Sequence, residues 1–153
     1  MKWLPIHVLL IACVAPAFAQ DWHLNTEPVY FLAKAPNLAL DYQISPSIAL
    51  GFQYSALDWG KNGRNLSGLQ MFYSRTGEIA SSSEVLKVYV GLLSRQTTLL
   101  KIETNDDPVP LVEILYGYRW VVKGNFTVAV LAGTFFTSKH IYPGLSFPVG
   151  LWF

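Results

Sequence analysis

The most constraining feature of this 153-residue chain is an alternation of bulky apolar residues with small or polar ones, repeated in segment after segment. A period of two residues is typical of β-strands, because successive side chains point to opposite faces of a sheet. The clearest example lies within 47–59. One face carries Ile48, Leu50, Phe52, Tyr54 and Ala56, and the other carries Ser47, Ala49, Gly51, Gln53 and Ser55.

The same pattern predicts further strands at 68–74, 86–93, 112–120, 126–136 and 144–153. The early region 29–44 is either one long strand or two strands broken at 34–36. Two strands there bring the total to eight; an unbroken first strand with an extra strand at 97–104 also gives eight. Turn-forming residues separate the segments and place short turns at 45–47 and 123–124 on one end, with longer loops at 60–65 and 94–109 on the other.

The two faces of the predicted strands differ in a way that decides which one points inward. Hydrophobic residues make up 52% of the chain and charged residues only 14%, whereas soluble domains are about a quarter charged. The bulky face carries no charge in the middle of any strand, and every glycine within the assigned strands falls on the opposite face. Because a narrow barrel interior needs small residues, the sequence predicts an all-β fold: a closed, antiparallel, up-and-down transmembrane barrel with its bulky face in lipid.

The inward face of this predicted barrel also carries polar and charged side chains, namely Asp41, Gln53, Gln70, Lys87, Glu113 and Arg119. Unpaired charges in a narrow lumen would suffer a large desolvation penalty. We therefore expect these side chains to pair with one another as a structural plug. A small conductance and a ligand site are the alternatives.

The first residues predict export from the cytoplasm. Lys2, an apolar stretch through Val14 and the small residues Ala17 and Ala19 are typical of a signal peptide at 1–19. Residues 20–153 then form a single barrel domain. An alternative is lipoprotein processing at Cys13, the only cysteine. Without Lys2 the remaining ten basic and ten acidic residues balance, so no nucleic-acid partner is expected.

The last strand carries a more specific signal. The alternation Leu145-x-Phe147-x-Val149-x-Leu151-x-Phe153 resembles the terminal β-signal of bacterial outer-membrane proteins. The resemblance implies a Gram-negative outer membrane, with Phe147, Val149, Leu151 and Phe153 recognised by the barrel-assembly machinery. The region 36–52 also resembles small uncharacterised outer-membrane barrels, although Gln43 replaces a basic residue of their acidic-aromatic-basic triplet.

These features favour a structural, adhesive or surface-interaction role exercised through the loops around 60–65, 94–109 and 138–142, with outer-membrane lipid as the partner. A second hypothesis is an outer-leaflet enzyme similar to lipid A deacylases or acyltransferases, with Ser138 and His140 as candidate catalytic residues and with Asp106 and Asp107 in another loop predicted to face outside. A third is a soluble periplasmic carrier resembling lipocalins. No cofactor or metal is expected, because His23 and His140 show no ligand spacing and read as solvated loop residues.

Overall fold

The computed structural model describes residues 21–28, 36–57, 64–94, 108–123 and 125–153, and most of them belong to strands. The strands are β1 (Trp22–Thr26), β2 (Asn37–Ser45), β3 (Ile48–Leu57), β4 (Arg64–Ser74), β5 (Ser83–Ser94), β6 (Val109–Val122), β7 (Phe126–Thr137), β8 (Ile141–Ser146) and β9 (Val149–Trp152). No helix within these ranges is long and apolar enough to cross a membrane.

The strands close into a barrel with eight strand positions around its wall, and we call each position a stave. Each strand from β1 to β7 pairs antiparallel with its neighbour in sequence, and β9 pairs with β1 to complete the ring. Strands β8 and β9 both pair with β7 in one continuous register, so they are two halves of a single stave interrupted at Phe147-Pro148. The pairing is interrupted there because proline has no N–H to donate to the hydrogen-bond ladder between strands. The predicted eight-stranded, up-and-down barrel is confirmed.

The first stave lies elsewhere than the sequence predicted. It is formed by Trp22–Thr26, ahead of the expected strand at 29–34, and residues 29–35 lie outside the described part of the chain. The alternative strand at 97–104 also lies outside it. The prediction failed because β1 is only five residues long and carries the polar residues His23 and Asn25 on its inner face.

The pairing register sets how steeply the strands tilt. Starting at Leu24 and moving from partner to partner around the barrel, the path runs through Leu40, Phe52, Leu69, Val90, Val112 and Phe136 to Ile141. Leu24 itself pairs with Leu151, ten residues beyond Ile141. This stagger is a shear of ten residues, and for eight strands it corresponds to a tilt of about 40°.

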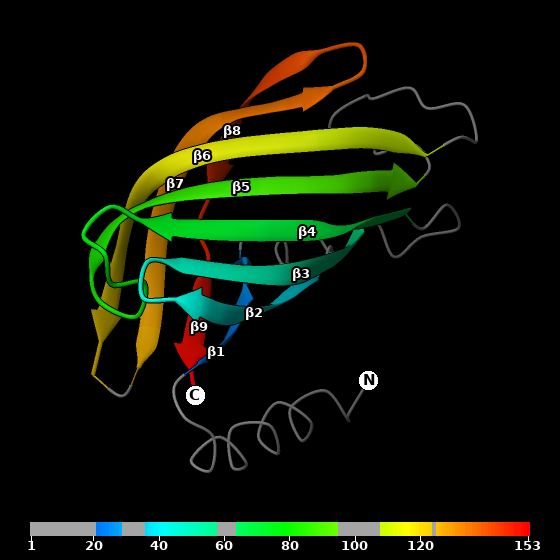
Figure 1. The fold of residues 1–153 in the computed structure, drawn as a ribbon. Helices are drawn as coiled ribbons and strands as arrows, with labels where there is room; N and C mark the ends of the chain where they lie inside the picture. Colours follow the sequence, from blue (N-terminus) through cyan, green and yellow to red (C-terminus); the bar gives the residue numbers. More distant parts are fainter. Residues whose placement is uncertain (1–20, 29–35, 58–63, 95–107, 124) are drawn as a thin grey trace, which may run out of the picture.

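The barrel has two unlike ends (Figure 1). At one, which we call the turn end, the strands are joined by residues 46–47, 75–82 and 123–125. At the other, the loop end, the connections are 27–36, 58–63, 95–108 and 138–140. The predicted short turns at 45–47 and 123–124 therefore do share one end.

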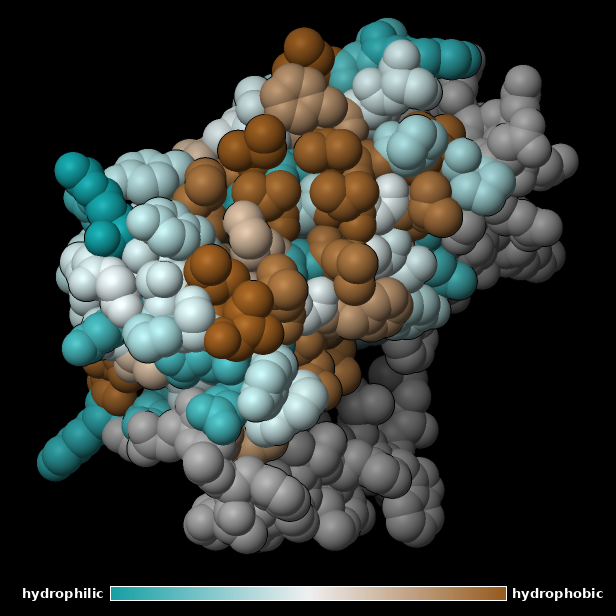
Figure 2. Space-filling model, viewed as in Figure 1, coloured by the Kyte–Doolittle hydropathy of each residue, from teal (hydrophilic) through white to brown (hydrophobic). Residues whose placement is uncertain are grey.

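The wall presents its bulky side chains outward. Leu69 is 68% exposed, Val90 55% and Phe52 51%, whereas Gln70, Tyr89 and Gln53 beside them on the other face are buried. Figure 2 shows a broad apolar area across the middle of the strands, with paler and hydrophilic residues towards both ends. The two predicted faces are confirmed in the predicted strands that the structure describes.

The apolar part of the interior gathers around the turn end. Ile79, in the middle of the connection 75–82, is fully buried and packs with Ala49, Phe72, Val85, Leu115, Ala129, Leu131 and Trp152. The Ile79 N–H donates to the carbonyl of Pro46 at 2.5 Å. This connection therefore folds into the barrel mouth.

Candidate functional site

The largest polar cluster inside the barrel is built around the carboxylate of Asp41 on β2, which is 0% exposed. Asn25 Nδ2 of β1 donates to Asp41 Oδ2 at 2.6 Å, and Gln70 Nε2 of β4 donates to Oδ1, also at 2.6 Å. His23 Nδ1 lies 3.1 Å from Oδ2. Three side chains from two strands thus contact one buried charge, which offsets the cost of removing it from water.

His23 extends this cluster across the barrel. Its Nε2 lies 2.8 Å from Thr127 Oγ1 on β7, and its ring stacks on the indole of Trp152 with centroids 4.6 Å apart. The glycines of the neighbouring strands make room. A β-carbon at Gly51 would overlap the Asp41 carboxylate, and one at Gly150 would lie 2.5 Å from His23 Nε2.

The order Asp41–His23–Thr127 is that of an orienting carboxylate, a base and a nucleophile. A hydrolase with this order would need its hydroxyl open to a substrate. Thr127 is buried at 2% exposure, His23 and Asp41 are equally enclosed, and the indole of Trp152 covers the imidazole. The arrangement therefore joins β1, β2 and β7 inside the wall and leaves no room for chemistry on a substrate.

A second cluster surrounds Lys87 on β5, which is 1% exposed. Its Nζ lies 3.2 Å from Glu27 Oε1 and 3.4 Å from Glu113 Oε2 on β6. The hydroxyl of Ser146 on β8 donates to the same Glu27 oxygen at 2.7 Å. One ammonium group between two carboxylates joins β5 and β6 to the chain just after β1.

Arg119 on β6 occupies the apolar region near the turn end. It is 2% exposed, and its guanidinium carbon lies 5.9 Å from the ring centre of Phe72 and 5.7 Å from that of Trp152. One of its terminal nitrogens donates to the backbone carbonyl of Ile79. The charge is therefore held by two aromatic faces and by the connection 75–82 that enters the barrel mouth.

The structure places all six residues of the predicted lumen network inside the barrel, but in separate groups. Asp41 contacts Gln70, and Lys87 contacts Glu113. Gln53 lies apart, donating to Ser55 Oγ at 3.4 Å, and Arg119 bonds to backbone. The lumen contacts thus form separate groups, and several of them join strands that are not neighbours in the wall, such as β2 with β4 and β1 with β7.

The sequence reasoning missed the partners that complete these groups: His23, Asn25, Glu27, Thr127, Ser146 and Trp152. The expectation that His23 is a solvated loop residue is wrong, because it lies inside β1 at 3% exposure. The alternation of Trp22, Leu24 and Thr26 with His23 and Asn25 was the available signal, and it is short. His140, in contrast, is exposed as expected.

The candidate catalytic residues Ser138 and His140 lie in the exposed connection between β7 and β8. The His140 ring contacts Tyr142 at a centroid distance of 5.8 Å, and its backbone N–H donates to Thr137 Oγ1. Asp106 and Asp107 lie outside the described residues. Among those that are described, no group of three His, Cys, Asp or Glu side chains gathers as a metal site.

Comparisons with known proteins add no functional assignment. No protein-family model, no curated protein and no solved structure matches this chain.

Proposed function

We propose that this protein is an outer-membrane β-barrel of a Gram-negative bacterium with a plugged lumen. The observation that carries the proposal is the direction of the side chains: apolar residues cover the outer wall, while Asp41, Lys87 and Arg119 are buried inside. A soluble barrel in water has the opposite arrangement. Closed barrels of this kind cross membranes because every strand edge is paired.

The filled interior argues against both transport and carriage. A lipocalin-like carrier needs an apolar cavity for its ligand, whereas this barrel encloses two polar clusters and a packed apolar core around Arg119. Many lumen side chains are buried, among them Gln53, Tyr89, Leu115 and Trp152, which leaves little space for solute. A function must then be exercised outside the barrel wall.

We infer that this function is structural or adhesive and is exercised at the loop end. The connections there include 95–108, the longest of the barrel, while two of the three at the turn end are tight. Short turns on the periplasmic side and long loops outside are typical of outer-membrane barrels. The predicted export segment Met1–Ala19 agrees with this location.

Cell fractionation tests the membrane assignment. We expect the protein in the outer-membrane fraction, with faster migration on SDS gels when unheated than when boiled, because a closed barrel resists detergent. A protein that remains soluble without detergent would exclude the proposal and favour the carrier hypothesis.

Replacing 97–106 with a short Gly-Ser linker tests the role of the loop end. We expect the variant to remain heat-modifiable while cells lose aggregation and attachment to matrix-coated surfaces. If the mass spectrum of lipid A differs between cells with and without the protein, the protein would instead be assigned to the lipid-modifying enzymes.

A further inference from the structure

One ion pair lies on the outer face of the wall, at the turn end. Arg75 Nη1, just after β4, lies 2.8 Å from Glu84 Oε2 on β5, and the hydroxyl of Tyr116 on β6 donates to the same oxygen at 2.7 Å. The other ion pairs between described residues are all inside the barrel. A charged pair on an otherwise apolar wall marks where that wall meets a different medium.

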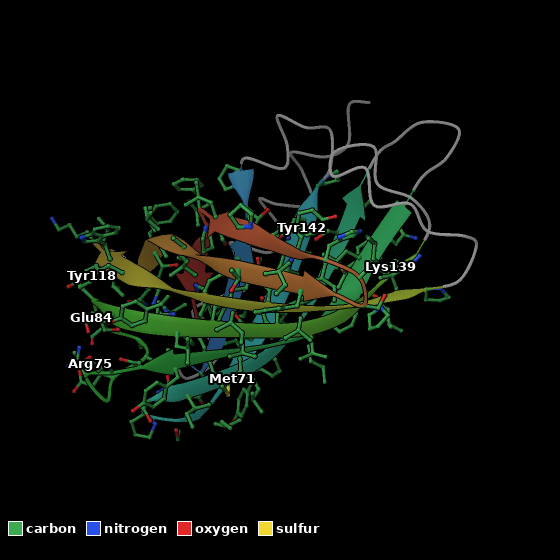
Figure 3. The ribbon with its side chains drawn as sticks, turned by 90° about the horizontal axis from the view of Figure 1, so that it is seen from above. Met71, Arg75, Glu84, Tyr118, Lys139 and Tyr142 are labelled. Atoms are coloured by element: carbon green, nitrogen blue, oxygen red, sulfur yellow. The ribbon has the colours of Figure 1, made fainter. Side chains whose placement is uncertain are left out.

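Aromatic side chains on the same part of the wall indicate what that medium is. Tyr73, Tyr118 and Trp120 are exposed outward, and Tyr118 and Trp120 lie against each other at 5.0 Å. Arg75 and Glu84 project from the end of the barrel that carries Tyr118, away from Lys139 (Figure 3). Rings with polar tips collect at the headgroup level of a bilayer, so the ion pair would lie among headgroups.

The ion pair retains capacity for a further partner. Both described donors to Glu84 use Oε2, which leaves the lone pairs of Oε1 for another donor. Arg75 uses one guanidinium nitrogen in this pair and also interacts with the Tyr116 hydroxyl, and its side chain is largely exposed. The site therefore offers a cation and an anion side by side.

The net charge of the turn end favours some lipid headgroups over others. The described acidic residues Asp21, Glu78 and Glu84 outnumber the basic residues Arg75 and Lys123. An anionic lipid would meet this excess negative charge, and a choline headgroup has no N–H to donate to a carboxylate. A primary ammonium linked to a phosphate fits both members of the pair.

We propose that Arg75 and Glu84 form a binding site for the phosphoethanolamine headgroup, which carries such an ammonium and phosphate. The phosphate accepts hydrogen bonds from the Arg75 guanidinium, and the ammonium donates to the Glu84 carboxylate. This inference rests on the proposed membrane location and names the lipid class at the turn end.

The test uses the barrel folded into micelles that contain equal amounts of phosphatidylethanolamine, phosphatidylcholine and phosphatidylglycerol, with retained lipids counted by native mass spectrometry. We expect the wild type to retain phosphatidylethanolamine about two- to fivefold over the other two, as suits an exposed charge pair. Glu84→Gln and Arg75→Gln should abolish the preference.

Two variants serve as matched controls. Glu78→Gln removes the same charge from the same end, and Lys139→Gln removes one positive charge from the loop end; both should keep the preference. Equal retention of the three lipids by the wild type overturns the inference, as does a loss in Glu78→Gln equal to that in Glu84→Gln. A protein that enters neither micelles nor vesicles overturns the membrane assignment as well.

Discussion

At the scale of single residues, the interior of this barrel depends on how each buried charge is compensated. Asp41 receives three donors, and Lys87 is held between two carboxylates. Removing one partner of a buried pair leaves an uncompensated charge, which costs much more than the pair contributes net. Sensitivity to substitution should therefore be greatest at the central member of each group.

Asp41→Ala tests this at the first cluster. The change leaves His23, Asn25 and Gln70 without their common acceptor, and we expect the free energy of unfolding to fall by about 3–5 kcal/mol. Urea titration in detergent micelles, followed by tryptophan fluorescence, measures the loss. Asp21→Ala is the control and should change stability by less than about 0.5 kcal/mol. Equal effects of the two substitutions would show that the cluster is not structural.

At the scale of elements, the lumen side chains act as ties between staves. The Lys87 group joins β5, β6 and β8 to the residue that follows β1, so it connects parts of the chain far apart in sequence. Its role as a plug predicts a stability effect without a change in permeability.

For Glu113→Ala we expect a decrease of about 1–3 kcal/mol in the free energy of unfolding, because Lys87 loses one charged hydrogen-bond partner and keeps Glu27. The measurement is again urea unfolding in detergent, combined with conductance in planar bilayers. If the stability were unchanged and a new conductance appeared, Glu113 would line a pore and would not be part of a plug.

The connection 75–82 is a second element-scale tie, since its only fully buried side chain, Ile79, fills the barrel mouth. Ile79→Ala should cost about 2–4 kcal/mol through the cavity that it leaves. Hydrogen exchange should rise in this connection first. Glu78→Ala, at the exposed residue next to Ile79, is the control. An equal rise in hydrogen exchange in that variant would argue against anchoring by Ile79.

At the scale of the whole molecule, the proposed function depends on what surrounds the barrel. Val90→Arg places a charge on the outer wall in the middle part of β5, where lipid would make it cost about 2–4 kcal/mol, while Tyr118→Arg near the turn end should cost about 0–1 kcal/mol. Unfolding from phospholipid vesicles measures both. A surface in water would tolerate the two equally, so equal values would contradict a bilayer around the wall.

Much of the architecture is readable from local pattern alone. Alternation assigns each side chain to a face without reference to any partner, which is why the inward glycines and the outward Leu50, Phe52 and Val90 were predicted correctly. The predicted count of eight agrees with the structure, although it was reached with a strand at 29–34, and the first strand of the barrel is Trp22–Thr26. The pattern was weakest in β1, where five residues with two polar members give too little periodicity to recognise.

By itself, then, the sequence determined the alternation of faces, because it follows from the two-residue period of an extended backbone. Only the tertiary structure decided which buried groups meet. The shear of ten residues sets which staves bring their inward residues to one level, and it places His23 beside Thr127 although they are more than a hundred residues apart. Pairing across the barrel depends on closure, and closure is a property of all eight staves together.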